Sequence, residues 1–596
     1  MDERGLRALV AAVKDGRLSR RSFVGRMAAL GLAAPLAGAM LAQAGVARAE
    51  DAEASYKPTA AGGGGPLKLL FWQGPTLLNP HFATGTKDQE ACRIFYEPLA
   101  AWNGGGDLVS VLAAAVPSTA DGTVAADGRS VVWKLKPGVR WHDGTPLTAD
   151  DLVFTWAYAK DPAAATVSIG TYKDITVEKL DDLSVKVSFS KPTPFWADAF
   201  VGTVGSVIPK HLFADYTGAK SRDAPTNLHP VGTGPYTFVE FRPGDLLRGE
   251  RNKAYHMANK PFFDAIELKG GGDAVSAARA VLQTGEYDYA WNTQVEDEVL
   301  KRLEDGGKGR VELVYGGNLE FILLNATDPD TEVDGERSSI KTEHFAFSDP
   351  AVRRAMSLLI DRDAIQQFIY GRTGKTTANT VTGPARFVSH DTHNAFDIAQ
   401  ANALLDAAGW ARGPDGIRAK NGRRLHFLFQ TSINAPRQKT QAIIKQACAK
   451  AGIDLELKSV TASVFFSSDV ANPDTYPHFY ADMEMYTNTV QQPDPTRWML
   501  QYVSWEVAQK SNKWQGLNIV RWRSDEFDKL YHQSETELDP VKRAALFIRM
   551  NDLVVADNVV PLIHRAKVGA AINTLQAPQS GWDNDLWNLP DWWKQA

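Results

Sequence analysis

A histidine beside an aspartate, His142 and Asp143, is a feature of the sequence that could perform chemistry. An aspartate can orient a histidine that acts as a general base. The surrounding sequence supplies no nucleophile to complete a triad and no further ligands to complete a metal shell. Because Asp143 precedes Gly144, a common turn pair, we interpret the motif as a turn at the exit of a strand, with a catalytic role as the alternative.

Three further motifs resemble phosphate-binding or metal-binding sequences, but each lacks a feature that such a site requires. Residues 371–376, GRTGKT, have two residues between their glycines where a P-loop needs four to wrap a phosphate. The GTG at 232–234 lacks the strand before it and the helix after it that a dinucleotide site requires. His390 and His393 have no cysteine or acid ligands arranged around them. The chain also has no HExxH and no GxSxG motif, so we expect no catalytic residue, no metal and no cofactor.

The elements that position these motifs follow an α/β pattern. Residues 131–135 alternate as a strand, Pro137-Gly138 breaks that strand, and Thr148 with Asp151 forms a capping box before a helix. Residues 321–325 form a short apolar run, which is typical of a strand buried on both faces. Helices are predicted at 86–99, 274–283, 350–371, 436–450 and from Pro540, and strands at 67–72, 183–189, 287–290 and 453–458.

Length and composition restrict the possible classes of protein. A chain of 596 residues exceeds a single core, so two or more lobes are expected. The net charge of −5 argues against nucleic acid as a partner, because phosphate binding favours a basic surface. Cys92 and Cys448 each lie in a helical pattern, which favours buried free thiols over a disulfide.

The N-terminus has the sequence features of an export signal. Arg20 and Arg21 form a twin-arginine motif, an apolar run covers residues 27–41, and residues 47–49 read Ala-Arg-Ala. We therefore expect a Tat signal over residues 1–49 that is cleaved near Ala49, with retention as a membrane anchor as the alternative. Residues 50–66, which include four consecutive glycines, are predicted to be a flexible leader outside the fold. The mature protein is expected to be soluble and periplasmic.

Two segments resemble one known family. Residues 133–156, WKLKPGVRWHDGTPLTADDLVFTW, closely resemble the hallmark of the family 5 extracellular solute-binding proteins, and residues 232–238, GTGPYTF, resemble a second signature of that family. The resemblance implies a two-lobed α/β periplasmic binding protein, type II-like and of cluster C. The resemblance also implies an extra small α/β domain in the first lobe and two hinge strands between the lobes. Residues 321–325 and 561–564 are the expected crossings between the lobes.

The resemblance also implies domain bounds. Lobe I would comprise residues 67–86, 225–318 and 563–596, its extra domain residues 87–224, and lobe II residues 319–562. The ligand would bind in the cleft between the lobes. The cleft candidates are Trp72, Gln73, Trp291, Asn292, Tyr486, Asn488, Gln491 and Trp498.

The implied function is the periplasmic substrate-binding component of an ABC transporter. The chain would capture a peptide-like or other small organic solute and deliver it to a permease in the inner membrane, as a monomer exported by the Tat machinery. A non-peptide solute, such as an opine, an oligosaccharide or a metal chelate, is the alternative. A Tat-exported enzyme is a more remote alternative, because no nucleophile arrangement or cofactor motif is present.

One position leaves the ligand class open. In peptide-binding members of the family, an aspartate four residues before the proline of an acid–Pro turn pairs with the peptide's amino terminus. Here Asp494-Pro495 fits the turn, and Gln491 stands where the aspartate is expected. An amide accepts a hydrogen bond but cannot neutralise a buried ammonium group. Asp482 and Glu484 lie upstream on the same predicted strand and could substitute for it.

Overall fold

The computed structural model describes residues 56–83, 85–466, 471–490, 492–514 and 516–595. The predicted Tat signal, residues 1–49, lies outside these residues. Within the described ranges, no helix is both long and apolar enough to cross a membrane.

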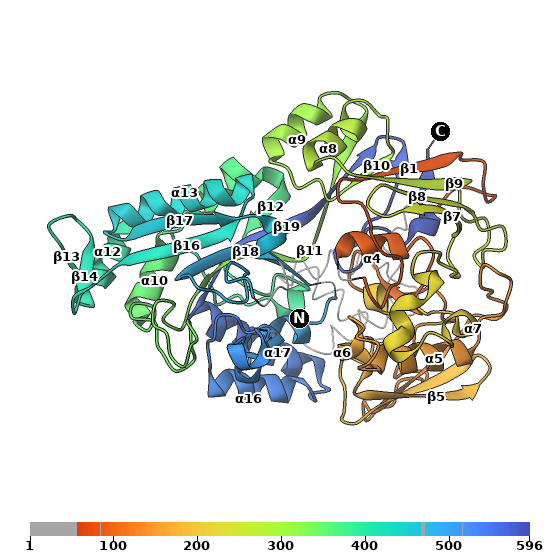
Figure 1. The fold of residues 1–596 in the computed structure, drawn as a ribbon, viewed down its shortest axis with the longest axis horizontal. Coiled ribbons are helices and arrows are strands. Elements are labelled where there is room, and N and C mark those ends of the chain that lie inside the picture. The colour runs from red at the N-terminus through yellow and green to blue at the C-terminus, as the bar shows by residue number, and fades with distance from the viewer. Residues whose placement is uncertain (1–55, 84, 467–470, 491, 515, 596) are drawn as a thin grey trace, which may run out of the picture. The chain divides into compact units, whose positions relative to one another are not determined.

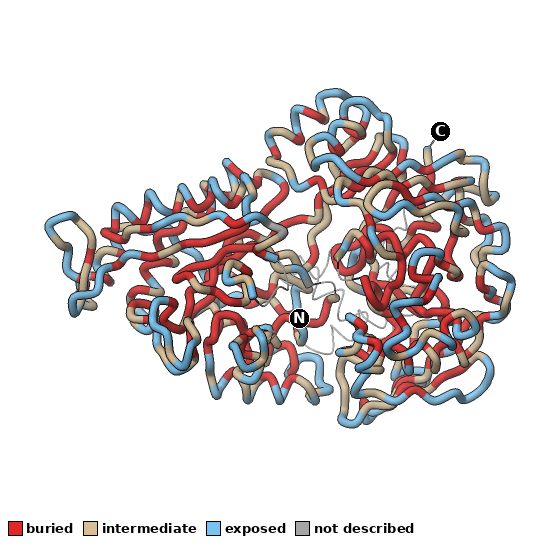
Figure 2. Tube along the Cα trace, viewed as in Figure 1, coloured by how far each residue is buried: buried red, intermediate tan, exposed pale blue. Residues whose placement is uncertain are grey.

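An eleven-stranded mixed sheet organises the fold (Figure 1). Its strands follow the order β17-β16-β18-β11-β19-β10-β1-β9-β8-β7, and β12 pairs with β19 in addition. The strands are β1 (Pro66–Phe71), β7 (Tyr236–Arg242), β8 (Leu246–Arg251), β9 (Ala265–Gly270), β10 (Tyr289–Trp291), β11 (Gly309–Leu324), β12 (Gly374–Thr376), β16 (His426–Ser432), β17 (Asp454–Val460), β18 (Met483–Val490) and β19 (Val559–Ile572). Buried residues predominate along β16 and β19, whereas most residues of β7 are partly exposed. Figure 2 shows the buried residues of the whole described chain.

The strands β11 and β19 connect the two halves of this sheet. They pair antiparallel along most of their length, from Gly309 opposite Ile572 to Leu323 opposite Val559. The C-terminal half of β11 also pairs with β18, while the C-terminal end of β19 pairs with β10. These are the two crossing strands predicted around residues 321–325 and 561–564. The α/β fold with two hinge strands is therefore confirmed.

On one side of the crossing, β1 lies between the parallel strands β9 and β10. Leu67, Leu69 and Phe71 of β1 are fully buried in a core shared with α4 and the C-terminal segment. The helices and remaining strands of this part are α4 (Thr86–Cys92), α8 (Ala274–Leu282), α9 (Asp297–Glu304), β20 (Leu575–Gln576) and β21 (Trp593–Lys594).

A second, smaller sheet of order β4-β6-β5 lies in the predicted extra domain. Its core includes Trp133 and Trp141 from the segment that resembles the family hallmark. The capping box is confirmed, because Thr148 and Asp151 satisfy each other's backbone amides at the start of α5. The elements are β2 (Ala100–Trp102), β3 (Leu108–Ser110), β4 (Ser130–Lys134), α5 (Ala149–Lys160), α6 (Ile169–Tyr172), β5 (Ile175–Asp181), β6 (Ser184–Phe189) and α7 (Lys210–Phe213).

On the other side of the crossing, β16 lies parallel between β17 and β18. Apolar residues of these strands are buried in cores that the neighbouring helices cover. The elements are α10 (Pro350–Leu358), α11 (Arg362–Ile365), α12 (Ile398–Ala407), β13 (Ala411–Arg412), β14 (Arg418–Lys420), β15 (Arg423–Arg424), α13 (Ala435–Lys450), α14 (Ala462–Phe465), α15 (Thr496–Met499), α16 (Asp525–Ser534) and α17 (Pro540–Val555).

Three predicted segments differ from the structure. The helix expected at 86–99 ends at Cys92, and β2 begins at Ala100. The helix expected over 350–371 breaks after Leu358, because the Asp361 side chain accepts the Ala364 amide and starts α11. The last part of the predicted leader belongs to the fold. Gly63 and Gly65 donate to the Asp264 carboxylate at 3.0 Å each.

Cys92 and Cys448 are both buried free thiols, as the sequence predicted. The bounds proposed for lobe I, its extra domain and lobe II stay a prediction, and we use the three names below in that sense.

A close approach of two glycines at the crossing gives a test of this packing. A Cβ atom at Gly316 of β11 would lie 1.8 Å from the Gly581 carbonyl oxygen, a backbone atom that cannot rotate away. Gly316→Ala should therefore lower the free energy of unfolding by about 3 kcal/mol, the upper part of the usual range for overpacking. Gly170→Ala is the matched control, because its Cβ would meet one atom, at 3.6 Å. Equal urea midpoints for the two variants would contradict this packing.

Candidate functional site

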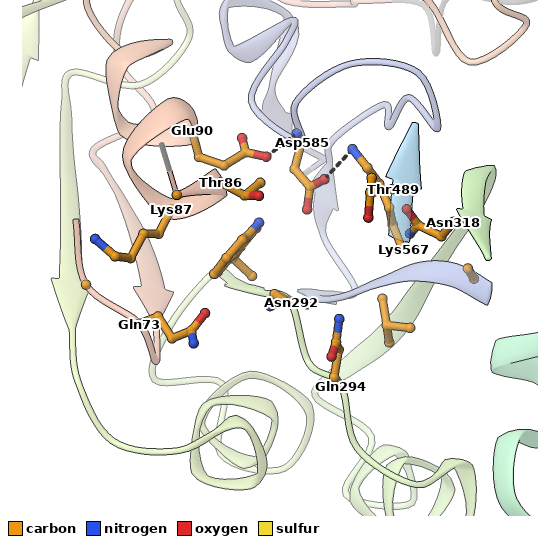
Figure 3. Close-up of a pocket in the computed structure, with 15 residues that line it drawn as sticks. Gln73, Thr86, Lys87, Glu90, Asn292, Gln294, Asn318, Thr489, Lys567 and Asp585 are labelled. Carbon is orange, nitrogen blue, oxygen red and sulfur yellow. Dashed lines mark hydrogen bonds and ion pairs between the residues drawn. The ribbon is translucent and has the colours of Figure 1, made fainter. Parts of the chain in front are cut away.

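A pocket of about 440 Å³ is lined by residues from both sides of the crossing strands (Figure 3). This volume lies within the usual range for small-molecule sites. The residues that line it are Gln73, Gly74, Gly85, Thr86, Lys87, Glu90, Trp291, Asn292, Gln294, Asn318, Thr489, Ala566, Lys567, Val568 and Asp585.

The lobe I wall of the pocket is built where two parallel strands end together. Phe71 of β1 is in register with Trp291 of β10, and their rings stack with centroids 5.0 Å apart. Gln73 and Asn292 follow these strands into the pocket. Asn292 has a φ of 54°, a left-handed conformation that asparagine tolerates better than most residues. Trp72 does not line the pocket. Its Nε1–H donates to the Asn292 carbonyl at 3.0 Å and thereby holds the turn.

The opposite wall comes from β11 and β18. Asn318 lies opposite Thr489 in the strand register, and both side chains line the pocket beside Lys567 (Figure 3). Because alternate residues of a strand face opposite sides, Tyr486 and Asn488 point away from Thr489. Tyr486 is buried against Phe321, with ring centroids 4.9 Å apart, and Asn488 Nδ2 donates to Gln501 at 3.3 Å.

The structure therefore brings Gln73, Trp291 and Asn292 together, and four of the other candidates, Trp72, Tyr486, Asn488 and Trp498, do not line the pocket. Trp498 of α15 is buried and packs edge-on against Phe321. Gln491 lies outside the described residues. All eight stay predictions as ligand-binding residues.

A buried group of charges forms one end of the pocket (Figure 3). The Glu90 carboxylate accepts the amides of Asp585 at 2.8 Å and Leu586 at 3.0 Å. Asp585 in turn accepts from Lys567 Nζ at 3.1 Å and from the Tyr289 hydroxyl at 2.8 Å. Burial, followed by the nearby Asp585 charge, raises the pKa of Glu90 to about 8, although Lys567 and the two amides oppose the rise. Glu90 is therefore mainly protonated at neutral pH.

The other charges at or near the pocket are also paired. Lys87 donates to Asp88 at 2.9 Å and to the Thr76 hydroxyl at 3.0 Å. The acid of the acid–Pro turn, Asp494, is held by a two-point contact with Arg543, one bond of which spans 3.0 Å. That carboxylate is therefore occupied within the protein.

The two acids that could have replaced an aspartate at position 491 face the interior. Asp482 accepts from His344 at 2.9 Å and from the Leu428 amide at 2.6 Å. Glu484 accepts from Gln430 at 2.6 Å, and burial raises its pKa well above the ordinary value. Neither lines the pocket, so the suggestion that one of them substitutes for the missing aspartate finds no support in their positions.

His142 and Asp143 have structural contacts that agree with the turn interpretation. His142 Nδ1 accepts the Gly232 amide at 3.2 Å, and its Nε2 lies 3.0 Å from the Gly234 carbonyl. Burial lowers the pKa of His142, which keeps the ring neutral. Asp143 pairs with His211 at 2.6 Å. The two segments that resemble the family thus bind each other.

A metal site needs several ligands close together. In the described part of the chain, no three His, Cys, Asp or Glu side chains come close enough to hold an ion. His390 and His393 are both exposed. Residues 371–376 form a turn and the short strand β12 rather than a loop that leads into a helix, so they do not have the context of a P-loop.

Sequence reasoning missed Glu90, Asn318, Thr489, Lys567 and Asp585. Glu90 and Asp585 are almost 500 positions apart, and no local pattern links them. The charged residues Arg565 and Lys567 were a usable signal, since they lie two residues apart on a strand whose other residues, apart from His564, are apolar.

Comparison with family models gives one match that spans most of the chain. Residues 114–507 match the family described as bacterial extracellular solute-binding proteins, family 5 Middle.

Individual relatives and solved structures point the same way. The chain is 24% identical to the oligopeptide-binding protein AppA of Bacillus subtilis over 89% of the chain and 92% of AppA. It is 26% identical to the glutathione-binding protein GsiB of Pectobacterium atrosepticum over 65% of the chain and 68% of GsiB. NikZ from Campylobacter jejuni, solved with Ni(L-His), superposes with a TM-score of 0.72 at 20% identity, over 89% of this chain and 99% of NikZ.

The raised pKa of Glu90 predicts a specific dependence of stability on pH. The folded protein keeps the Glu90 proton up to a pKa of about 8, whereas the unfolded chain loses it near the ordinary glutamate pKa of 4.5. The stability that this proton contributes is complete below pH 4.5 and is lost as the pH rises to 8, by up to about 1.4 kcal/mol per pH unit. Glu90→Gln should remove this loss, so its stability relative to the wild type should increase from pH 5.5 to 7.5.

Urea unfolding at several pH values measures the effect. Glu178→Gln, at an exposed position of β5, is the control and should follow the wild-type profile because it leaves Glu90 in place. Parallel pH profiles for Glu90→Gln and the wild type would contradict a protonated Glu90.

Proposed function

The chain belongs to the family 5 bacterial extracellular solute-binding proteins, the substrate-binding components of ABC transporters, and we propose that it captures a small polar solute without a free cationic amine. The solute is peptide-like or another hydrogen-bonding organic molecule. It binds in the pocket between the lobes and passes from there to a permease of the inner membrane.

One observation supports this solute class. The pocket offers neutral amide and hydroxyl groups, while the charged groups that line it are paired within the protein. Neutral donors and acceptors match amide or hydroxyl groups of a solute. A free ammonium group would be left without a neutralising partner, which is costly in a desolvated site. The neutral side chains are Gln73, Thr86, Asn292, Gln294, Asn318 and Thr489.

The ligands in solved structures of similar proteins suggest alternative solutes for this pocket. AppA was solved with a nonapeptide and NikZ with Ni(L-His). A pocket of about 440 Å³ favours a small solute over a long peptide. Among the described residues that line it there is no histidine or cysteine, which counts against a nickel–histidine-type chelate held by such ligands. An opine or a short saccharide remains the second candidate, because the Trp291 indole can stack on a sugar ring.

The remote alternative, an exported enzyme, has little support in the pocket. The part of its lining that the structure describes includes no serine or cysteine that could act as a nucleophile and no histidine that could act as a base. Export by the Tat machinery, a periplasmic location and action as a monomer are parts of the same proposal. The twin-arginine motif supports the first two.

The proposal predicts that the protein binds and releases its solute unchanged. Protein purified from its own host should retain a solute that native mass spectrometry detects, as a mass that denaturation removes. Returning this solute to ligand-free protein should raise the melting temperature by mass action and make the molecule more compact in small-angle scattering. Recovery of a chemically altered solute from protein free of contaminating enzymes would contradict the proposal.

The Asn292 amide gives a test at one residue. Asn292→Gly preserves the left-handed backbone and removes the side chain, so its effect should fall on binding rather than on stability. Loss of one hydrogen bond of about 1 kcal/mol predicts about fivefold weaker binding in calorimetry with the released solute.

Asn421→Gly is the matched control, because Asn421 also has a positive φ, of 52°, and is exposed outside the pocket lining. Unchanged affinity in Asn292→Gly, or an equal loss in Asn421→Gly, would count against this pocket as the binding site.

A further inference from the structure

A buried cluster of one carboxylate and two guanidinium groups lies at the crossing strands, next to the pocket. Arg437 of α13 donates to Glu320 of β11 at 2.7 Å, and Arg565 of β19 donates to the same carboxylate at 3.2 Å. Both arginines also bond the Thr487 hydroxyl, at 3.0 and 2.9 Å. The side chain of Glu320 is fully buried, and those of Arg437 and Arg565 are 8% and 9% exposed.

The charges of this cluster do not balance. Burial alone would raise the pKa of Glu320, but the charges of Arg437 and Arg565, together with the hydrogen bonds from Arg437 and Thr487, hold that pKa below its ordinary value. The neighbouring Tyr370, whose ring lies 5.4 Å from the Arg565 guanidinium, is no counter-ion, because burial raises its pKa. Among the described ion pairs, Glu320 is the one carboxylate that meets either arginine. One positive charge therefore remains in a desolvated place, where a charge needs a partner.

Hydrogen bonding locates this positive charge at Arg565. Arg437 uses Nε and both terminal nitrogens on Glu320, Ser432 and Thr487. Both hydrogen bonds of Arg565 to the described chain come from Nη1. The N–H groups of Nε and Nη2 are thus left for an acceptor from outside, and a guanidinium edge matches the two oxygens of a carboxylate.

Strand geometry places Arg565 beside the pocket. Lys567 lies two residues along β19 from Arg565, Thr489 lies two residues along β18 from Thr487, and Asn318 lies two residues along β11 from Glu320. All three of these residues line the pocket. Residues two apart on a strand share a face and are separated by about 7 Å. The cluster is therefore one step beyond the pocket wall on three adjacent strands, toward lobe II.

We propose that Arg565 forms a carboxylate subsite at the lobe II end of the pocket, so that the captured solute carries one carboxylate at the end opposite lobe I. This inference rests on the proposed function, which supplies the pocket's role. It narrows the solute class to polar molecules with a carboxylate and without a free cationic amine, such as an N-blocked peptide.

Two named probes test the subsite on the full mature chain. N-acetyl-trialanine with its free carboxylate should bind at least tenfold more tightly in calorimetry than its C-terminal amide. Arg565→Gln should abolish this preference, and Arg565→Lys should keep part of it. Arg248→Gln is the control, because Arg248 pairs with Glu240 and Glu267 on the exposed strands of lobe I, and it should bind like the wild type. Arg565→Gln leaves Glu320 and Arg437 as a balanced pair, which favours a folded variant.

Acetate, a small free carboxylate, provides a measurement that does not depend on peptide binding. At equal ionic strength, acetate should raise the melting temperature of the wild type above the value in chloride, and this rise should be absent in Arg565→Gln. Equal binding of the acid and the amide, or a preference that survives in Arg565→Gln, would overturn the subsite. If neither peptide binds, the absence of an acetate effect would overturn it. If chloride stabilises the protein as much as acetate does, Arg565 binds a simple inorganic anion. That result would also overturn the carboxylate subsite.

These outcomes separate the subsite from the proposed function. Equal, tight binding of both peptides would remove the subsite and leave the receptor function intact. Stabilisation by acetate in a protein that retains no solute and binds neither peptide would support the subsite and count against the receptor function.

Discussion

The pairing of β11 with β19 is the constraint on which the pocket depends. These two strands link the parallel strands around β1 to those around β16, and they also carry pocket residues themselves: Asn318 on β11 and Lys567 on β19. The pairing is interrupted by a register shift between Tyr315 and Leu319, where Gly316 packs backbone to backbone against Gly581. The pocket therefore lies where the two lobes share strands, so a solute bound there contacts elements of both.

Electrostatic pairing decides what this pocket can recognise. Asp585, Lys567, Lys87 and Asp494 are all engaged by other protein groups, and burial favours the neutral form of Glu90. Because opposite charges inside the protein satisfy each other, the solute meets mainly neutral donors and acceptors. The cluster at Arg565 departs from this pattern, since its two guanidinium groups face one carboxylate. The walls of the site offer neutral hydrogen-bonding groups, and one cation in it is unbalanced. Such a site selects its solute by the pattern of hydrogen bonds and, at one point, by charge.

Much of the architecture follows from local sequence signals. Thr148 and Asp151 predict a helix start, the apolar run at 321–325 predicts a buried crossing strand, and the helix predicted at 436–450 corresponds to α13. Local signals failed where neighbouring interactions compete. Asp361 could either continue a helix or cap a new one, and only its contact with the Ala364 amide decides between them.

The site was less predictable than the fold for a physical reason. Gln73, Trp291 and Asn292 could be found because side chains that follow adjacent parallel strands meet at one edge of the sheet. On β18, Tyr486 and Asn488 lie on one face, and Thr487 and Thr489 lie on the other. Which of these faces lines the pocket depends on the register of β18 with β11, which the sequence of β18 alone does not encode. Glu90, Lys567 and Asp585 meet only through tertiary packing.

The central claim is that one solute is bound simultaneously by the end of β10, by β18 and by β19. A crystal structure of the native protein with its retained solute measures this most directly. The account predicts that the solute contacts Asn292, Thr489 and Lys567 within hydrogen-bond distance. A solute bound in another cavity, or one that contacts residues of a single lobe, would contradict the account.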